Sequence, residues 1–537
     1  MAGRTAQAGT LNALLDARVA DGGDDPALIQ GDTRITYAEV AARVRRVAAG
    51  LARLGIGPGD RVAVWLGNDP AWIELEFALA RLGAVAVAIN TKYRRHEVED
   101  IVGRSGARAL VLPPTLGEID CLALIADCDD EALAALETLV LVGEAPAGDC
   151  YAGRSLASYA ALGAHGEHAR DEGAPDAPCM IFTSSGTTSA PKLVTHRQAA
   201  LVHHALAVAD AFGYRGVADT VVLAMLPYCG VFGFNTVMGA FAAGRPTVLL
   251  PAFEAGAAVA AIECHGVTHT NGADEMFRRI LDAAEPVSRI ATLREGAFAN
   301  FSADAAALVD RAHALGIKLF QTYGASEVQA LMVYAAAGSG PERWALGGGT
   351  PASSDTRVRV RDTESGRLLG PGESGEIEVG GPNVMVGYLG NDEANAKTFT
   401  DDGFVRTGDL GYMESGDTFV YLARLGDTLR LGGFLVNPRE IEAYLESFDA
   451  IDQAQVVAVD TERGPRPVAW VIVPAGHHLD ADSIIAACQA DMAKYKVPVR
   501  LIETEAFPTT PSANGVKIQK AKLRERAQAE IDAGVSS

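Results

Sequence analysis

The hydrophobic positions of this chain form two alternating patterns. Short apolar runs typical of buried strands occupy Arg61–Leu66, Arg108–Leu112, Thr138–Val142, Met180–Phe182, Val221–Met225 and Thr247–Leu250. Ala-rich segments with apolar residues every three or four positions lie between such runs, for example Tyr37–Leu54 and Ala71–Leu82. This repeated strand-helix alternation predicts an α/β architecture with largely parallel sheets.

The pattern changes after residue 345, where glycine turns separate short β-branched strands such as Arg357–Arg361 and Glu376–Val379. Beyond Ala423 the chain passes through the turn dipeptide Gly426-Asp427 and then alternates strand and helix again. We therefore predict a large N-terminal domain over residues 1–425, made of βα-layered subdomains plus a β-rich module. A small α+β domain over residues 426–537 follows it.

Length and charge narrow the class of protein. At about 150 residues per domain, 537 residues suggest three or four core units. The chain carries 46 Lys and Arg against 68 Asp and Glu, a net charge of −22, so nucleic acid and anionic membranes are not expected partners. Seven scattered cysteines without a C-x-x-C pair, and an N-terminus without an apolar signal core, predict free thiols and a cytoplasmic location.

One stretch, Val221–Gly244, contains no charged residue and is long enough to be considered as a membrane span. Pro227, Asn235 and the glycines within it favour a buried strand, turn and helix instead. We expect no integral membrane segment.

The segment most informative about chemistry is Thr183–Leu193, TSSGTTSAPKL, in which seven Ser, Thr or Gly residues follow an apolar run. Small residues allow backbone N–H groups to converge, hydroxyls add donors, and Lys192 adds a positive charge. This predicts a polyphosphate-binding loop, although a flexible Ser/Thr surface loop has a similar composition. The Walker pattern G-x-x-x-x-G-K-[ST] is absent, so an ordinary P-loop ATPase is not indicated.

Four further segments follow in order: Gln321–Glu327 (QTYGASE), Gly403–Leu410 (GFVRTGDL), Ala423–Glu442 and Pro508–Arg524. Together with Thr183–Leu193 they resemble the adenylate-forming (ANL) superfamily of acyl-CoA synthetases, adenylation domains and firefly-type luciferases, over essentially the whole chain. Within it, Val379–Leu389 and Leu431–Pro438 look most like carboxylate–CoA ligases.

The resemblance implies a two-step reaction with ATP, Mg²⁺ and coenzyme A. A carboxylate attacks the α-phosphate of ATP to give acyl-AMP and pyrophosphate, and the CoA thiol then displaces AMP. An anionic nucleophile must approach an anionic phosphate in the first step, so stabilisation of charge dominates.

The matched motif positions imply specific roles. The β- and γ-phosphates would be held by Thr183, Ser184, Ser185, Gly186, Thr187, Thr188 and Lys192. Glu327 would bind Mg²⁺, Ser326 would face the α-phosphate, and Lys517 would bridge the carboxylate and the α-phosphate. The adenine would stack on Tyr323 of the Tyr323-Gly324 pair, beside Gly296 and Ala297, whereas Asp409 would accept bonds from the ribose hydroxyls with Arg424 nearby.

The resemblance also implies a mobile C-terminal domain. Its pivot would be Gly426, and the glycine strand with Gly432 and Gly433 would approach the CoA tunnel. A pivot must absorb a large backbone rotation, which suits glycine, although Gly426 could also be a plain turn residue. The basic run Lys520, Lys522 and Arg524 is expected to be a solvated face.

Several positions depart from the family pattern and bear on the acid. Cys229 and Gly230, which follow Tyr228, stand where relatives carry an aromatic-His pair, so bulk is removed beside the expected acyl group. These three residues are the predicted acyl-binding residues. Asn271–Met276 (NGADEM) brings Asp274 and Glu275 close to that pocket, unless they face solvent. In the loop, Ser189 and Leu193 replace usual glycines, and Lys517 stands two residues after Gly515 rather than directly after a glycine.

The leading hypothesis is an AMP-forming carboxylate–CoA ligase. The alternative is an adenylating enzyme that loads a carrier protein or performs mainly one half-reaction. A third hypothesis is a catalytically silent nucleotide-binding protein. The joint presence of the four motif residues Glu327, Asp409, Arg424 and Lys517 argues against it. The acid, the pathway and the oligomeric state, including a homodimer, are left open by the sequence.

Overall fold

The structure, a computed structural model, describes residues 9–144, 146–184, 191–300, 305–336, 338–426, 428–431, 434–461, 464–512 and 515–535. The chain divides into two compact units. Unit 1 comprises Met1–Arg359, Glu378–Thr407 and Ser415–Phe419, and unit 2 comprises Val360–Ile377, Gly408–Glu414 and Val420–Ser537.

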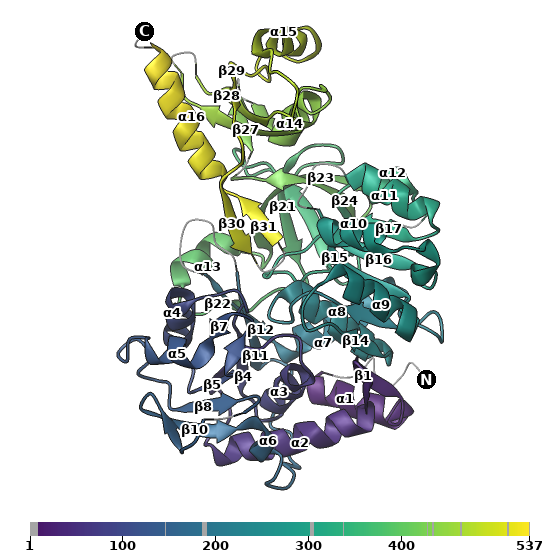
Figure 1. Cartoon of the computed structure of the whole chain (residues 1–537), viewed down its shortest axis with the longest axis vertical. Helices are drawn as coiled ribbons and strands as arrows, with labels where there is room; N and C mark the ends of the chain where they lie inside the picture. Colours follow the sequence, from purple (N-terminus) through teal and green to yellow (C-terminus); the bar gives the residue numbers. More distant parts are fainter. Residues whose placement is uncertain are drawn as a thin grey trace. The chain divides into compact units, whose positions relative to one another are not determined.

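Two large sheets form the framework of unit 1 (Figure 1). The nine-stranded sheet has the order β22 (Gly387–Tyr388), β12 (Leu193–Arg197), β11 (Pro178–Thr183), β4 (Val85–Ala88), β3 (Arg61–Val64), β5 (Ala109–Leu112), β8 (Thr138–Leu141), β10 (Arg154–Ser158), β9 (Cys150–Tyr151). The seven-stranded sheet has the order β17 (Lys318–Gln321), β16 (Glu295–Ala299), β15 (His269–Ala273), β13 (Val222–Ala224), β14 (Thr247–Leu249), β1 (Pro26–Gln30), β2 (Thr33–Thr36). Their central pairs are parallel, and antiparallel pairs occur toward the edges, as in β11–β12 and β1–β2.

The helices of unit 1 follow the predicted alternation. They are α1 (Leu11–Gly22), α2 (Tyr37–Arg53), α3 (Pro70–Arg81), α4 (Arg95–Ser105), α5 (Cys121–Ala126), α6 (Tyr159–Leu162), α7 (Gln198–Ala211), α8 (Val231–Ala243), α9 (Ala255–His265), α10 (Asp274–Ala283), α11 (Ala305–Ala314), α12 (Pro341–Trp344) and α13 (Asp392–Thr398). Local sequence sets where they begin. Thr36 and Glu39 form a capping box before α2, and Asp69 caps α3 ahead of Pro70.

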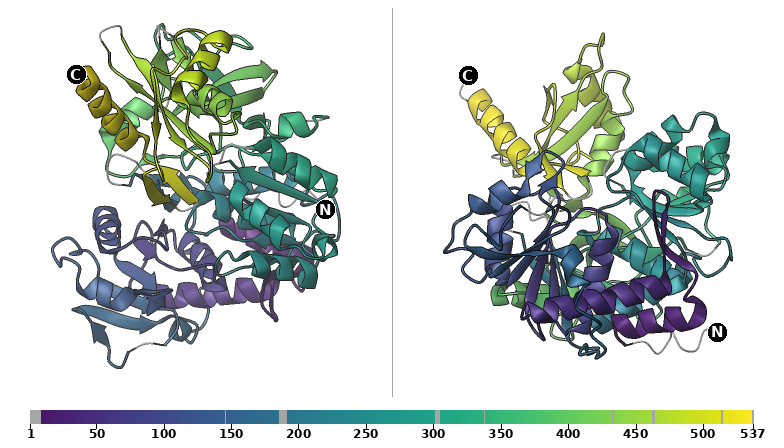
Figure 2. Two further views of the ribbon diagram at one scale, coloured as in Figure 1. Left: turned by 45° about the horizontal axis from the view of Figure 1, so that its top comes forward. Right: turned by 60° about the horizontal axis from the view of Figure 1, so that its bottom comes forward.

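Successive side chains along a strand point to opposite faces of its sheet, and both faces of each large sheet are covered by a hydrophobic core. In β3, Val62 and Val64 belong to a core shared with the seven-stranded sheet and with α1, α2, α3, α7 and α8, whereas Ala63 faces a second core with α4 and α5. In β13, Leu223 faces a third core with α9, α10 and α11. Unit 1 is therefore a layered arrangement in which helices lie between the two sheets and on both outer faces (Figures 1 and 2).

The uncharged stretch Val221–Gly244 forms β13, a turn and the buried helix α8, as predicted. Among the described residues, no helix is both long and apolar enough to cross a membrane.

The predicted β-rich module is a six-stranded sheet. Its order is β18 (Val333–Tyr334), β19 (Gly348–Pro351), β24 (Thr418–Arg424), β23 (Val405–Ser415), β21 (Gly375–Gly380), β20 (Arg357–Arg361). The remaining short elements of unit 1 are the pair β6 (Thr115–Leu116) and β7 (Ile119–Asp120) and a 3₁₀ turn over Val287–Ile290.

The last part of unit 2 is a small α+β fold. It contains β25 (Leu429–Leu431), β26 (Phe434–Val436), α14 (Pro438–Leu445), β27 (Gln453–Val459), β28 (Arg466–Ile472), α15 (Ala481–Asp491), β29 (Arg500–Glu503), β30 (Thr509–Ser512), β31 (Gly515–Ile518) and α16 (Lys520–Val535). Val456 lies in a core with α14 and α15, and Val457 in a core with α16, so the sheet β27-β28-β29 has helices on both faces. The predicted α/β fold class is confirmed, whereas a domain boundary at residue 426 stays a prediction.

Candidate active site

The predicted phosphate-binding segment leaves β11 at Thr183 and enters β12 at Leu193, which are paired neighbours in the sheet. Next to this pair, the Ser184 N–H donates to the Lys192 carbonyl at 3.0 Å, and the Lys192 N–H donates to Ser184 Oγ at 3.3 Å. These bonds join the two ends of the segment. Ser185, Gly186, Thr187 and Thr188 lie outside the described residues, so their phosphate-binding role stays a prediction.

Tyr388 joins Lys192 to Glu327. The Lys192 ammonium lies 4.5 Å from the centroid of the Tyr388 ring and 3.5 Å from its hydroxyl oxygen. That hydroxyl donates to Glu327 Oε1 at 2.9 Å, and the Met385 N–H donates to the Glu327 carbonyl at 2.8 Å. The Lys192 ammonium, predicted to bind phosphate, and the Glu327 carboxylate, predicted to bind metal, therefore both contact the phenol of Tyr388. A role for Tyr388 was not predicted from the sequence.

Glu327 fits a metal ion that arrives with a nucleotide. The part of the chain that the structure describes contains no cluster of three or more His, Cys, Asp or Glu able to form a metal site by itself. Mg²⁺ commonly uses one or two protein carboxylates and takes its other ligands from substrate phosphates and water. A single partly buried carboxylate near Lys192 is compatible with that mode of binding.

The predicted adenine-stacking residue, Tyr323, is buried and makes an edge-to-face contact with Phe419, with ring centroids 5.3 Å apart. Gly324 is required by close packing, since a Cβ there would lie 2.4 Å from the Gln329 carbonyl oxygen. Gly296 and Ala297 lie on β16, and Phe298 of that strand accepts a bond from the Thr322 N–H at 3.0 Å. The four predicted adenine-site residues are thus on neighbouring segments.

Two buried histidines hold the segment that contains Ser326. His196 Nε2 lies 2.7 Å from the Ser326 carbonyl oxygen, and His204 Nε2 lies 2.7 Å from that of Ala330. A carbonyl can only accept, so both Nε2 atoms carry hydrogen. Burial lowers the pKa of His196 and of His204 to about 4, against partial compensation by these bonds. Both rings are therefore neutral at pH 7.

We expect these rings to make stability depend on pH. In the folded protein the pKa of each ring lies below the unfolded value near 6.5, so the unfolded state binds protons more readily. The free energy of unfolding is therefore highest above about pH 6.5 and decreases as the pH falls toward about 4. At pH 5 each histidine should lower the free energy of unfolding by about 2 kcal/mol relative to its value at pH 7. Urea unfolding of wild type and His204→Gln at pH 7 and pH 5 would measure this. The pH-dependent loss should be smaller in the variant, and identical losses would contradict the assignment.

The predicted acyl-side residues Tyr228, Cys229 and Gly230 lie in the turn that precedes α8. Tyr228 is 1% exposed and Cys229 is 4% exposed, and burial raises the pKa of the Cys229 thiol to about 11. The phenol of Tyr93, which was not predicted from the sequence, lies near the Thr183 side chain and near Cys229, and burial raises its pKa. Cys229 is thus close to the end of β11, whereas contact of Tyr228, Cys229 and Gly230 with an acid stays a prediction.

Asp274 is 1% exposed, in the first turn of α10. The alternative that Asp274 and Glu275 face solvent is therefore wrong for Asp274, whereas Glu275 is exposed. A substrate-binding role for Asp274 stays a prediction.

In unit 2, Asp409 of β23 is paired with Arg424 of β24, with 3.0 Å between Asp409 Oδ1 and Arg424 Nε. The Asp409 side chain is 3% exposed and that of Arg424 is 52% exposed. The Leu425 N–H donates to the Gly408 carbonyl at 2.8 Å, which links the ends of the two strands beside the pair. The two residues predicted for ribose are therefore adjacent.

Lys517 lies on β31 opposite Thr510 of β30, and its side chain lies outside the described part of the chain. Lys520, at the start of α16, was predicted to be a solvated charge, and this is wrong. Its ammonium lies 3.0 Å from Oε1 of the buried Glu442, which also accepts from the Val456 N–H at 2.9 Å. Burial of Glu442 requires a partner cation, and two lie beside it: Lys520 of α16 and Arg439 of α14, the latter 3.5 Å from Oε2.

Gly426, the predicted pivot, lies in a turn where an added Cβ would meet no atom within 4 Å. Gly432 and Gly433 lie outside the described residues. Gly426→Ala should therefore be tolerated, whereas Gly426→Pro fixes φ near about −65° and should abolish overall acyl-CoA formation while retaining one half-reaction. Assays of adenylation, and of thioester formation from synthetic acyl-AMP, would test this. Full activity of the proline variant in both would exclude Gly426 as the pivot.

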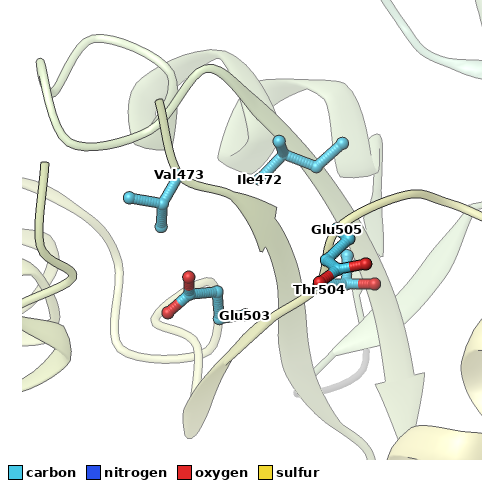
Figure 3. A pocket seen from close by; sticks show the side chains of 5 residues that line it. All are labelled: Ile472, Val473, Glu503, Thr504 and Glu505. Atoms are coloured by element: carbon cyan, nitrogen blue, oxygen red, sulfur yellow. The ribbon is translucent and has the colours of Figure 1, made fainter. Parts of the chain in front are cut away.

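A surface pocket of 510 Å³ lies in unit 2, lined by Ile472, Val473, Glu503, Thr504 and Glu505 (Figure 3). None of the predicted site residues lines it. Its two carboxylates disfavour phosphate by repulsion between like charges.

Comparison with known proteins identifies the family of the chain. The AMP-binding enzyme family matches residues 15–389, and the AMP-binding enzyme C-terminal domain matches residues 440–514. The chain is 33% identical to pyochelin synthase PchD of Pseudomonas aeruginosa strain UCBPP-PA14 over 521 residues, which covers 94% of this chain and 90% of that protein. It is 31% identical over 516 residues to a feruloyl-CoA synthase of Amycolatopsis sp. (93% and 95%), and 30% identical over 547 residues to 4-coumarate–CoA ligase 3 of Oryza sativa subsp. japonica (98% and 94%).

Among solved structures, ATP-bound MatB from Rhodopseudomonas palustris is similar with a TM-score of 0.80 and 26% identity, over 96% of this chain and 98% of that one. The anthranilate CoA ligase AuaEII in complex with anthranoyl-AMP has a TM-score of 0.81 at 22% identity, over 97% and 98%, which supports the fold alone. The chain belongs to the AMP-binding enzyme family, and the predicted adenylate-forming superfamily is confirmed.

Proposed function

We propose that this protein is an AMP-forming acid–thiol ligase. It activates a carboxylic acid with ATP to give acyl-AMP and pyrophosphate, and then transfers the acyl group to coenzyme A with release of AMP. The observation that carries the proposal is the Lys192–Tyr388–Glu327 arrangement at the end of a Ser/Thr/Gly segment. Membership of the family and relatives named as CoA ligases support both half-reactions.

In unit 1, we assign ATP phosphates to Thr183, Ser184 and Lys192 together with the neighbouring segment Ser185–Thr188. Mg²⁺ held by Glu327 would neutralise phosphate charge. Ser326 would face the α-phosphate, and Tyr323 would stack on adenine.

In unit 2, Asp409 and Arg424 would contact the ribose, and Lys517 would stabilise charge that develops between carboxylate and α-phosphate. The buried Asp409 carboxylate, which lies beside Arg424, supports the ribose assignment, because a carboxylate offers two acceptor oxygens to two hydroxyls. The domain division at Gly426 is part of this proposal.

The acid is proposed to be aromatic. Feruloyl-CoA synthase, 4-coumarate–CoA ligase and 2-hydroxy-7-methoxy-5-methyl-1-naphthoate–CoA ligase are named for such acids. Gly230 at the start of α8 supports a roomy site, since glycine has no side chain to occupy it.

The test is a panel of benzoic, cinnamic and naphthoic acids beside linear fatty acids, assayed for acid-dependent pyrophosphate exchange and for CoA-dependent AMP release. We expect both activities with at least one aromatic acid. Exchange without CoA-dependent release would exclude CoA as acceptor, and a phosphopantetheinyl carrier protein should then be tried. No exchange with any acid would contradict the proposed function.

We also propose a cytoplasmic location, because all seven cysteines are free thiols. Whether the protein forms a homodimer is left open, and sedimentation of the purified protein would test it.

A further inference from the structure

The segment Tyr323–Met332, which contains Ser326 and Glu327, is a tight loop with an unfavourable backbone. The Met332 N–H donates to the Tyr323 carbonyl at 3.1 Å, and the Val328 N–H donates to that of Ala325 at 3.2 Å. Gln329 has φ of 71°, in the left-handed region that disfavours residues with a Cβ. Such a conformation persists only where the surroundings hold it.

The Gln329 side chain supplies such contacts. It is 0% exposed, and its amide uses both ends. Nε2 lies 2.9 Å from His196 Nδ1, and Oε1 accepts from Asn235 Nδ2 at 3.1 Å. Asn235 Nδ2 also donates to the Ala330 carbonyl at 3.0 Å. The loop is therefore bonded to β12 through His196 and to α8 through Asn235.

The chemistry of the donors fixes one orientation for every member of this network. His196 Nε2 donates to the Ser326 carbonyl, so its Nδ1 must accept, and only the nitrogen end of the Gln329 amide can donate to it. The oxygen end then faces the Asn235 donor. A carboxylate of the same size would place an acceptor against an acceptor.

The bonded carbonyls of Ser326 and Ala330 lie on either side of Glu327. We propose that Gln329 is a positioning residue, whose amide locks this loop so that the Glu327 carboxylate is held ready for the metal-bound nucleotide. The inference rests on the proposed function and deepens it. Gln329 need not touch ATP, because it acts through His196, Asn235 and its own backbone.

The test compares Gln329→Gly with wild type by calorimetric titration of ATP with and without Mg²⁺, in the absence of any acid. Glycine accepts φ of 71° freely but lacks the amide. We expect the Kd for ATP with Mg²⁺ to rise about tenfold or more, as for loss of other groups that orient a metal ligand. The Kd for ATP without Mg²⁺ and thioester formation from synthetic acyl-AMP should change less than twofold.

Val328→Ala is the matched control. Val328 is equally buried in the same loop, but its side chain has no polar group, so this variant should lower the melting temperature without changing the Kd for ATP with Mg²⁺. Equal weakening in both variants, or wild-type binding by Gln329→Gly, would overturn the proposal. If Gln329→Gly does not fold, Gln329→Asn takes its place, since asparagine tolerates this φ but is one methylene too short to reach both partners. Wild-type binding by that variant would equally overturn it, and wild-type protein that binds no ATP would overturn the proposed function as well.

Discussion

The Lys517→Ala variant is expected to lose acid-dependent adenylation by at least about a hundredfold, equivalent to about 3 kcal/mol of transition-state stabilisation. The physical reason is that the Lys517 ammonium would stabilise the negative charge that develops between the carboxylate and the α-phosphate, which alanine cannot do. Thioester formation from synthetic acyl-AMP does not create that charge, and so it should continue near the wild-type rate. Single-turnover assays of the two half-reactions would measure the difference.

Lys522→Ala is a suitable control, because Lys522 is an exposed lysine on the adjoining helix α16. It should leave both half-reactions unchanged. If Lys517→Ala slowed the two steps equally, Lys517 would not be the adenylation lysine. The additional residue between Gly515 and Lys517, Val516, would then mean that this strand delivers a different side chain.

The Asp409→Asn variant should weaken ATP binding by about 10- to 100-fold without unfolding the protein. The carboxylate offers two acceptor oxygens to two hydroxyls, whereas the amide offers one, and a charge-assisted hydrogen bond contributes about 1.5–3 kcal/mol. Because Arg424 is half exposed, water can solvate it once its partner is neutral, so the melting temperature should fall little.

Glu376→Gln serves as control, since Glu376 is a neighbouring carboxylate that accepts from the Gly408 N–H at 3.1 Å but has no proposed contact with ATP. Its KM for ATP should match wild type. An unchanged KM for ATP and an unchanged rate in Asp409→Asn would remove Asp409 from the nucleotide site.

The strands and helices could be predicted because each depends on a local pattern. The apolar run at Thr138–Val142 became β8 over Thr138–Leu141, and the periodic segment Tyr37–Leu54 became α2 over Tyr37–Arg53. The order of strands could not be predicted in this way. For example, β1 pairs with β14, although more than 200 residues separate them in the sequence, and no local pattern specifies such a partner.

The same distinction applies to the candidate site. Motifs located Lys192 and Glu327, but the phenol of Tyr388 that joins them comes from a two-residue strand 196 positions after Lys192. Gln329 lies two residues after a recognised motif and was missed because its importance comes from a positive φ and two distant partners. Lys520 was misjudged because a basic run gives no sign that one member pairs with a buried carboxylate.

The distribution of thiols offers a direct way to observe motion. Of the seven cysteines, Cys150 and Cys264 are exposed, and both belong to unit 1. Maleimide dyes should therefore label unit 1 selectively in the native protein. With Cys264 and the partly exposed Cys128 replaced by serine, and with the substitution Ala521→Cys on exposed Ala521 of α16, Cys150 becomes one end of a fluorescence ruler. It would report the proposed rotation about Gly426 during turnover.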